Sequence, residues 1–329
     1  MTSKPPEFAT YRWSTDDCPE QDRLAYWCEV LGRQVLRIDM EAPSEALWRA
    51  DLTLRTLPEL NMISGVCSES CYRRTRGLVA DGNSDFGLVW YRAGGGIVAG
   101  RGREVPLQPG NALLLSWAEA HAVKTLWPSR FAGLAIPHTA LAPLVTNADD
   151  TVMRVIPGTE ALRLLTGYVG LLTDNQGLAT PELRRIAVAH VHDLAALAIG
   201  ASRDAAAAAE GRGVRAARLS AIKADIAENL GRQDLSVVAV AVRQGIRPRY
   251  IQRLFETEGT TFSQFVLAQR LHRAHRMLTG PRFAGWKISA IAFEAGFADL
   301  SYFNRAFRRR FAVSPSDVRE AARGSIGAS

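Results

Sequence analysis

The sequence predicts an α+β protein with two domains: an N-terminal β-sandwich or barrel with flanking helices, and a C-terminal all-α domain in which two helix-turn-helix units are joined by a long helix. A chain of 329 residues exceeds one ordinary domain. Short apolar or alternating segments separated by glycines fill much of the first half, whereas amphipathic helical segments fill the last third. We therefore expect domains at 1–200 and 214–323, with a linker at 201–213.

The N-terminal domain has a helical pattern first and a strand pattern after it. Apolar spacing predicts a helix at Asp17–Leu31, and residues from about 50 to 145 contain short strand-like runs. The clearest runs are Asp85–Ala93, Gly96–Leu107 and Gly110–Trp117. Short strands separated by tight glycine turns are typical of a sandwich or barrel.

Two helices follow the strands and precede a segment of low complexity. Period-3.6 apolar spacing predicts helices at Ala161–Leu172 and Pro181–Ile199, and Thr180 is the expected cap of the second. The next segment, ASRDAAAAAEGRG at 201–213, carries no core pattern, although its alanines could extend a helix. We predict that it is the linker.

The C-terminal third is helical throughout and carries the positive charge of the chain. The predicted helices are Leu219–Leu230, Ser236–Gln244, Pro248–Glu258, Thr261–Leu278, Ile288–Ala295, Leu300–Phe311 and Pro315–Ala322. From Arg215 onward there are 19 Lys and Arg against 9 Asp and Glu, a net charge of +10, whereas the preceding 214 residues have a net charge of −3. This asymmetry is expected when one domain binds a polyanion and the other does not.

A sequence repeat with an offset of about 51 residues lies inside the helical region. Each copy consists of a short helix, a glycine (Gly245 or Gly296) and a second helix of about three turns. A glycine at this position can adopt the left-handed conformation that ends a helix and turns the chain sharply. The repeat therefore predicts two helix-turn-helix units.

The second helix of each copy has one apolar and one polar face. In the first copy the core-facing positions are Ile251, Leu254 and Phe255, and the exposed stripe consists of Arg249, Gln252, Arg253 and Glu256. In the second copy the core-facing positions are Phe303, Phe307 and Phe311, and the stripe consists of Ser301, Asn304, Arg305 and Arg308. Arginine pairs with guanine, and glutamine or asparagine with adenine, in the major groove, which admits a helix.

A polar stripe on one amphipathic helix is usually only a solvated face. Two copies with arginine and an amide on the stripe, inside a segment of net charge +10, favour DNA binding instead. Thr261–Leu278 predicts a connecting helix of about 18 residues, or about 27 Å. One turn of DNA is about 34 Å, so such a rod could place both recognition helices in successive major grooves.

These residues resemble a known family. Ile288–Arg319 closely resembles the signature of AraC/XylS-type transcription regulators, and Leu235–Leu278 resembles the first helix-turn-helix unit and connector of that family. The matching residues are Ile291, Ala292, Gly296, Phe297, Ser301, Tyr302, Phe303, Arg305, Phe307, Phe311, Ser314, Pro315 and Arg319. The departures are Arg247 at a common cap position, Ala312 in place of a glycine, and the apolar Leu300 at a position that often contacts bases.

The resemblance implies a sequence-specific transcription regulator that binds double-stranded DNA, activates transcription and acts with RNA polymerase. It implies base contacts from Arg249, Gln252 and Arg253 in the first unit and from Leu300, Ser301, Asn304 and Arg305 in the second. We expect phosphate contacts from Arg247, Lys287 and Arg308.

More weakly, Val105–Trp117 and Phe131–Leu141 resemble the cupin-like ligand-binding domain of the same family. This resemblance implies a β-barrel that senses a small-molecule effector, followed by helices that form a homodimer. Two interpretations stay open for three arginines and three tryptophans of this region. Arg73, Arg74 and Arg76 either hold an acidic effector or form a solvated basic loop, and Trp90, Trp117 and Trp127 either line an aromatic pocket or pack in the core.

Two other functions are compatible with parts of the sequence: a sequence-indifferent architectural DNA binder and a cupin-type enzyme. We expect no enzyme, because no nucleophile–base arrangement or suitably spaced pair of carboxylates is present. We expect no metal or other cofactor, because the strands lack an H-x-H pair and the four cysteines lack a zinc-binding pattern. The sequence has no uninterrupted apolar run of about 18 residues and no apolar signal-peptide core at Met1–Phe8, so we expect a cytoplasmic protein.

Overall fold

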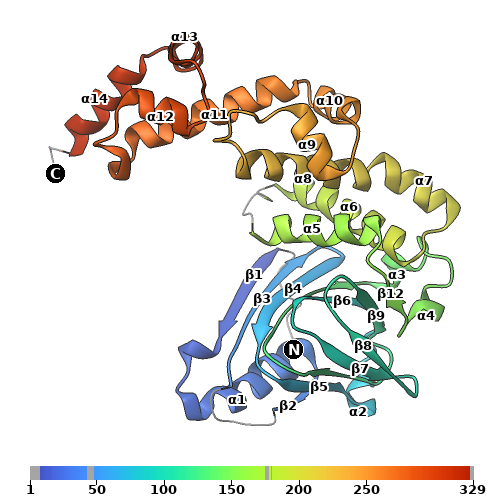
Figure 1. The fold of residues 1–329 in the computed structure, drawn as a ribbon. Helices are drawn as coiled ribbons and strands as arrows, with labels where there is room; N and C mark the ends of the chain where they lie inside the picture. The colour runs from blue at the N-terminus through green and yellow to red at the C-terminus, as the bar shows by residue number, and fades with distance from the viewer. Residues whose placement is uncertain (1–7, 43–47, 175–177, 179, 327–329) are drawn as a thin grey trace. The chain divides into compact units, whose positions relative to one another are not determined.

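A computed structural model describes residues 8–42, 48–174, 178 and 180–326 of the chain (Figure 1). Contacts divide the chain into two compact units, Met1–Ala217 and Arg218–Ser329. The first unit contains the β-strands, and the described part of the second is helical, so the predicted α+β two-domain fold is confirmed. The division falls inside helix α8 (Gly213–Glu228), a few residues after the predicted linker.

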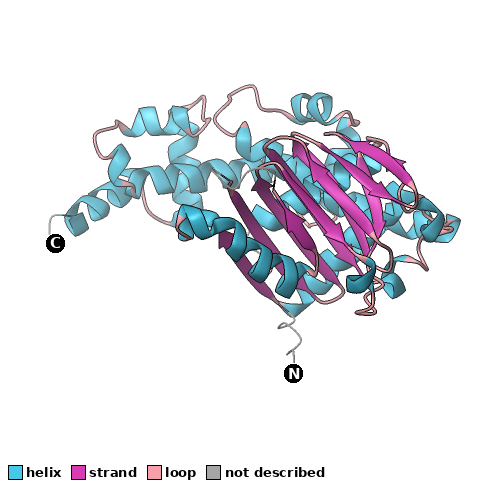
Figure 2. Cartoon of the chain, turned by 90° about the horizontal axis from the view of Figure 1, so that it is seen from below, coloured by secondary structure: helices cyan, strands magenta, loops and turns pink. Residues whose placement is uncertain are grey.

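Two antiparallel sheets form the N-terminal unit (Figures 1 and 2). In spatial order, the larger sheet consists of β1 (Ala9–Ser14), β3 (Ala50–Leu57), β4 (Leu60–Cys67), β11 (Ser129–Ile136), β6 (Phe86–Ala93), β9 (Ala112–Ser116) and β12 (Val155–Ile156). The smaller sheet consists of β2 (Asp39–Glu41), β5 (Ser70–Arg74), β10 (His121–Thr125), β7 (Gly96–Gly100) and β8 (Arg103–Leu107). The three predicted strand runs correspond to β6, to β7 with β8, and to β9.

The central strand β6 explains why part of this region is continuously apolar. Leu88 and Trp90 alternate with Val89 and Tyr91 along the strand, and three of the four are buried while Val89 is partly buried. The buried core that contains β6 also contains side chains of α5 (Glu160–Asp174) and α6 (Pro181–Ile199), so helices cover the sheet. A strand covered on both faces loses the alternation of a half-exposed strand.

The helices after the barrel are close to their predicted bounds. The Thr180 hydroxyl accepts a hydrogen bond from the Leu183 backbone N–H (3.2 Å), which confirms the predicted cap of α6. Helix α7 (Arg203–Gly211) lies within the segment predicted as the linker and packs against α6, with Ala209 fully buried. The Ser202 hydroxyl caps α7, and the alanine run supplies its high helix propensity.

The helix predicted at Asp17–Leu31 differs from the structure. Short 3₁₀ turns at Thr15–Asp17 and Glu20–Asp22 precede α1 (Arg23–Tyr26), which continues as a π-helix, η3 (Trp27–Leu36). Pro19 has no N–H and an extended conformation, so it breaks a helix that would start at Asp17. The remaining short helices of this unit are α2 (Arg76–Val79), α3 (His138–Leu141) and α4 (Ala148–Thr151).

The C-terminal unit follows the predicted helices closely. They are α9 (Val237–Gln244), α10 (Pro248–Glu256), α11 (Phe262–Thr279), α12 (Ile288–Glu294), α13 (Leu300–Phe311) and α14 (Pro315–Ile326), with a 3₁₀ turn at Pro281–Phe283. The 18-residue helix α11 belongs to two separate cores: Phe262 and Val266 pack with the first helix-turn-helix unit, and Ala274 and Met277 pack with the second. Among the described residues, no helix combines the length and apolarity needed to cross a membrane.

Candidate nucleic-acid interface

The first helix-turn-helix unit consists of α9 and α10. The Ser236 hydroxyl caps α9 by accepting a hydrogen bond from the Ala239 N–H (3.2 Å), and Gly245 ends the helix in the left-handed conformation (φ 64°). Pro248 begins α10 at its first position without a side-chain cap from Arg247. This sharp turn sets the direction of the recognition helix α10.

The apolar face of α10 fixes which side chains point outward. Ile251, Leu254 and Phe255 are buried, as the spacing predicts. The exposed side chains are Arg249, Gln252, Arg253 and Glu256, together with Arg247 just before the helix. The structure therefore brings the predicted base-contacting residues of this unit onto one exposed face.

The second unit, α12 and α13, is built in the same way, and its glycine lies in a more crowded position. Gly296 has φ 97°, and a Cβ at this position would lie 2.4 Å from the Leu230 carbonyl oxygen, so a side chain there would clash. The Asp299 carboxylate caps α13 by accepting a hydrogen bond from the Tyr302 N–H. Phe303 and Phe307 are fully buried on the inner face of the helix.

The outer face of α13 carries the predicted residues of the second unit. Exposed side chains are Leu300, Ser301, Arg305 and Arg308, while Asn304 is partly buried. Lys287, predicted to contact phosphate, is exposed immediately before α12. Arg309 was not predicted, yet it is exposed one turn after Arg305, and its i, i+4 spacing from that residue was the available signal.

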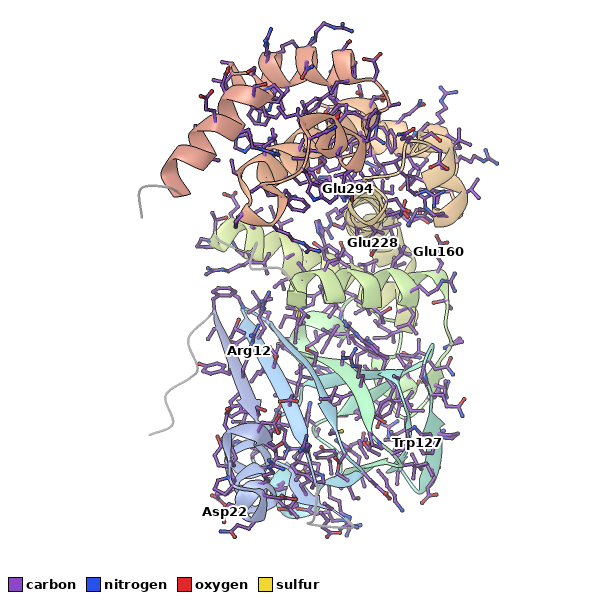
Figure 3. All side chains as sticks on the ribbon, turned by 60° about the vertical axis from the view of Figure 1, so that its left-hand side comes forward. Arg12, Asp22, Trp127, Glu160, Glu228 and Glu294 are labelled. Carbon is purple, nitrogen blue, oxygen red and sulfur yellow. The ribbon has the colours of Figure 1, made fainter. Side chains whose placement is uncertain are left out.

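Charge pairing separates structural arginines from available ones in this unit. Arg243 pairs with Asp225 (2.8 Å), which raises the pKa of the guanidinium through hydrogen bonding, and Arg273 pairs with Glu294 (2.9 Å), a residue labelled in Figure 3. By contrast, no salt bridge within the described ranges involves Arg249, Arg253 or Arg305. The stripe arginines thus keep their donors for a partner.

Two other arginines hold the unit together. Arg319, part of the family signature, is buried, and its Nη1 donates hydrogen bonds to the carbonyl oxygens of Trp286 (2.7 Å) and Ala284 (3.3 Å). Arg270 of α11 donates to the carbonyl oxygens of Leu230 (3.1 Å) and Arg232 (2.6 Å), and burial lowers its pKa. The Arg270 contacts hold α11 against the segment between α8 and α9. The Arg319 contacts hold α14 against the segment that precedes α12.

The N-terminal unit contains a cavity of about 150 Å³ between the two sheets. Trp90 and Trp117 line this cavity, whereas Trp127, labelled in Figure 3, is 50% exposed. Arg74 also lines it and is buried, so a solvated loop is the wrong interpretation for this residue. Arg73 and Arg76 are exposed. Within the described residues, no group of three or more His, Cys, Asp and Glu side chains could hold a metal ion.

Comparison with known proteins places this geometry in a family. Residues 240–321 match the helix-turn-helix domain family, a range that includes both recognition helices. The transcriptional activator RhrA of Rhizobium meliloti (strain 1021) is 33% identical over 246 residues, which are 74% of this chain and 76% of RhrA. The transcriptional activator NphR of a Rhodococcus species is 27% identical over 67% of this chain and 65% of its own length.

A solved structure extends the likeness to the fold of both units. The AraC-like transcriptional activator CuxR superimposes with a TM-score of 0.50 and 19% identity, covering 81% of this chain and 95% of CuxR. The matched relatives are transcription regulators rather than enzymes. The chain therefore belongs to the AraC family and is a DNA-binding transcription regulator of the helix-turn-helix type.

Proposed function

We propose that this regulator activates transcription by recognising two short DNA blocks about one helical turn apart, under the control of a small-molecule effector. The observation that carries the proposal is the pair of exposed stripes on α10 and α13, whose arginines Arg249, Arg253 and Arg305 form no salt bridge in the described parts of the chain. The relatives RhrA and NphR are named transcriptional activators, which supports activation.

Base recognition would come from side chains whose hydrogen-bonding groups match the edges of bases in the major groove. Arg253 and Arg305 suit guanine, whereas Gln252 and Asn304 suit adenine. Leu300 suits a thymine methyl group by apolar contact. Arg249 and Ser301 complete the proposed set of base-contacting residues.

Phosphate contacts would position the protein without reading sequence. We assign them to Arg247, Lys287 and Arg308, which are exposed beside the recognition helices. Replacing one of them should weaken binding to all duplexes alike and reduce the salt slope of log K by about 1. This signature distinguishes them from the residues that contact bases.

The N-terminal region, residues 1–200, would sense the effector and form a homodimer, and residues 214–323 would bind DNA. The cavity between the sheets supports an effector site, since ligand pockets are commonly concave, apolar and largely preformed. We propose that the effector changes how a dimer engages DNA and RNA polymerase. A regulator of this kind works in the cytoplasm, where it reaches the chromosome.

The test is selection of genomic DNA fragments by the purified full-length protein at fixed salt. We expect enrichment of a few sites, each with two short blocks separated by about one helical turn. Uniform, salt-sensitive retention of every fragment would favour the architectural alternative, because sequence-independent binding is electrostatic. The variant Arg253→Ala should lose enrichment of these sites, whereas Arg232→Ala, at an arginine paired with Asp234, should keep it.

A further inference from the structure

The cavity in the N-terminal unit offers a ligand almost entirely apolar surface. Side chains from both sheets and from the π-helix η3 line it, including Trp27, Ile63, Val89, Leu115, Val123 and Phe131. An apolar cavity of this size, about 150 Å³, is large enough for a single small ring, and its mainly apolar surface favours an apolar ligand. The volume of the cavity and its apolar lining therefore favour small, apolar ligands.

The single arginine of the lining is already occupied by the protein. Arg74 donates from Nε to the Trp117 carbonyl (2.7 Å), from Nη1 to the Arg37 carbonyl (3.0 Å) and from Nη2 to the Asp81 carboxylate (2.7 Å). Its guanidinium also lies 5.1 Å from the centre of the Trp117 ring. Arg74 pairs with Asp81, which Arg37 also contacts (3.6 Å), and each of its three nitrogens already donates one hydrogen bond, so Arg74 is held by the protein rather than directed at a ligand.

The polar groups of the lining pair mainly with one another. The Tyr91 and Thr125 hydroxyls, for example, are hydrogen-bonded to each other (3.2 Å). Burial raises the pKa of Cys67 and of Tyr91, so both side chains stay neutral near pH 7. These groups leave few hydrogen bonds for a sugar, whose many hydroxyls each require a partner.

His121 supplies a further polar atom, and the buried indole N–H groups of the lining residues Trp27 and Trp90 have no hydrogen-bond acceptor among the described residues. Its Nδ1 lies 3.0 Å from the Glu119 carbonyl, which only accepts, so Nδ1 carries the hydrogen and Nε2 is an acceptor in the neutral ring. Burial lowers the pKa of His121, which keeps the ring neutral. The His121 ring packs edge-on against the Trp117 ring, and 5.5 Å separates the two ring centroids.

We propose that this cavity binds a small, uncharged aromatic molecule, a single ring with few hydrogen-bonding groups. The inference rests on the proposed control of this regulator by a small-molecule effector and gives that effector a chemical class. Aromatic side chains on several sides favour a flat ring, and the occupied Arg74 disfavours carboxylates and phosphates.

The test compares toluene, benzoate and glucose as probes of the full-length protein by calorimetry and tryptophan fluorescence. Toluene and benzoate share one ring and differ in charge, so their comparison isolates the role of Arg74. We expect toluene to bind measurably and benzoate about a hundredfold more weakly or not at all, since an unpaired carboxylate would be buried. Glucose should not bind.

Cavity-filling variants locate the binding site. Val123→Phe places a ring inside the cavity and should abolish toluene binding, whereas Val155→Phe, at an exposed valine on β12, should leave it unchanged. Ile63→Phe fills the same cavity from the other sheet and replaces Val123→Phe if that variant does not fold, as judged by circular dichroism. Toluene binding that survives a folded cavity-filling variant overturns the inference.

The remaining outcomes separate this inference from the proposed function. Benzoate or glucose binding as tightly as toluene, or no binding of toluene, overturns the ligand class whatever the protein does on DNA. If toluene binds in the cavity but leaves binding to the enriched DNA sites unchanged, the ligand class stands and effector control falls. If a charged molecule binds and changes DNA binding, effector control stands and the ligand class falls.

Discussion

In the N-terminal unit, Arg74 is buried and each of its nitrogens donates a hydrogen bond within the protein. In the C-terminal unit, Arg253 and Arg305 are exposed and, among the described residues, take part in no salt bridge. The same side chain therefore stabilises the fold in one unit and remains available for a partner in the other. The difference lies in whether a carboxylate such as Asp81 is placed within reach.

Residue type alone therefore does not reveal whether an arginine stabilises the fold or is available to bind a partner. A buried arginine that donates several hydrogen bonds within the protein stabilises the fold, whereas an arginine without a salt bridge on an exposed helix face is available to bind a partner. Two predictions test this contrast between the arginines, and two smaller effects compare the units by backbone strain in the C-terminal unit and by buried histidines in the N-terminal unit.

Arg74→Met should destabilise the N-terminal unit by about 3–5 kcal/mol, because it removes a buried guanidinium that donates to the Trp117 and Arg37 carbonyl oxygens and pairs with the Asp81 carboxylate. Urea unfolding followed by tryptophan fluorescence measures this loss. The control is Arg73→Met, whose half-exposed side chain pairs with the exposed Glu41 and should cost less than about 1 kcal/mol. Equal losses in the two variants would contradict the assigned role of Arg74.

Arg305→Ala should weaken binding to a selected DNA site by about 1–3 kcal/mol and leave the fold intact. Fluorescence anisotropy at fixed salt, with the selected site and a scrambled duplex, measures the change. Arg232→Ala is the matched control, since that exposed arginine of the same unit pairs with Asp234 at 3.0 Å. An equal loss on both duplexes would assign Arg305 to phosphate rather than base contact.

Ala312→Gly should stabilise the C-terminal unit by about 1 kcal/mol. Ala312 ends α13 with φ 61°, a left-handed conformation that an alanine adopts at a cost and a glycine adopts freely. Thermal unfolding compares it with Ala306→Gly in the middle of the same helix, which should destabilise by about the same amount. A lower melting temperature for Ala312→Gly would disprove strain at this position.

The smallest effect is expected from mild acid and should be confined to the N-terminal unit. Burial lowers the pKa of His121 and of His192, so below about pH 6.5 the unfolded chain binds more protons than the folded one. Stability should therefore fall as the pH decreases from 7.5 to 5.5, measured by urea unfolding at several pH values. His192→Asn should flatten this dependence, and unchanged stability across the range would refute the assignment.

Much of the C-terminal unit could be predicted because short-range chemistry determines it. Gly245, Gly296 and Pro248 mark the turns, and the positions of Ile251 and Phe303 define the buried faces. Helix periodicity then places the opposite stripe outward without knowledge of any distant contact. Contacts to bases and phosphates stay predictions.

The N-terminal unit was less predictable because its site depends on distant pairing. Strand positions such as β6 and β9 followed from apolar runs, but cavity lining depends on register, and a shift of one residue moves every side chain to the other face. Arg74 is buried only because Asp81, Arg37 and Trp117 lie around it. No pattern near Arg74 in the sequence indicates that grouping.

Helix α11 has a consequence for how regulatory DNA can evolve. Each half of α11 packs in a different core, so neither helix-turn-helix unit can shift along α11 independently of the other. One inserted residue would rotate the second unit by about 100° and advance it by about 1.5 Å. With the proposed two-block site, a promoter that gains half a turn of DNA between its blocks would therefore escape this regulator, although every base of both blocks is preserved.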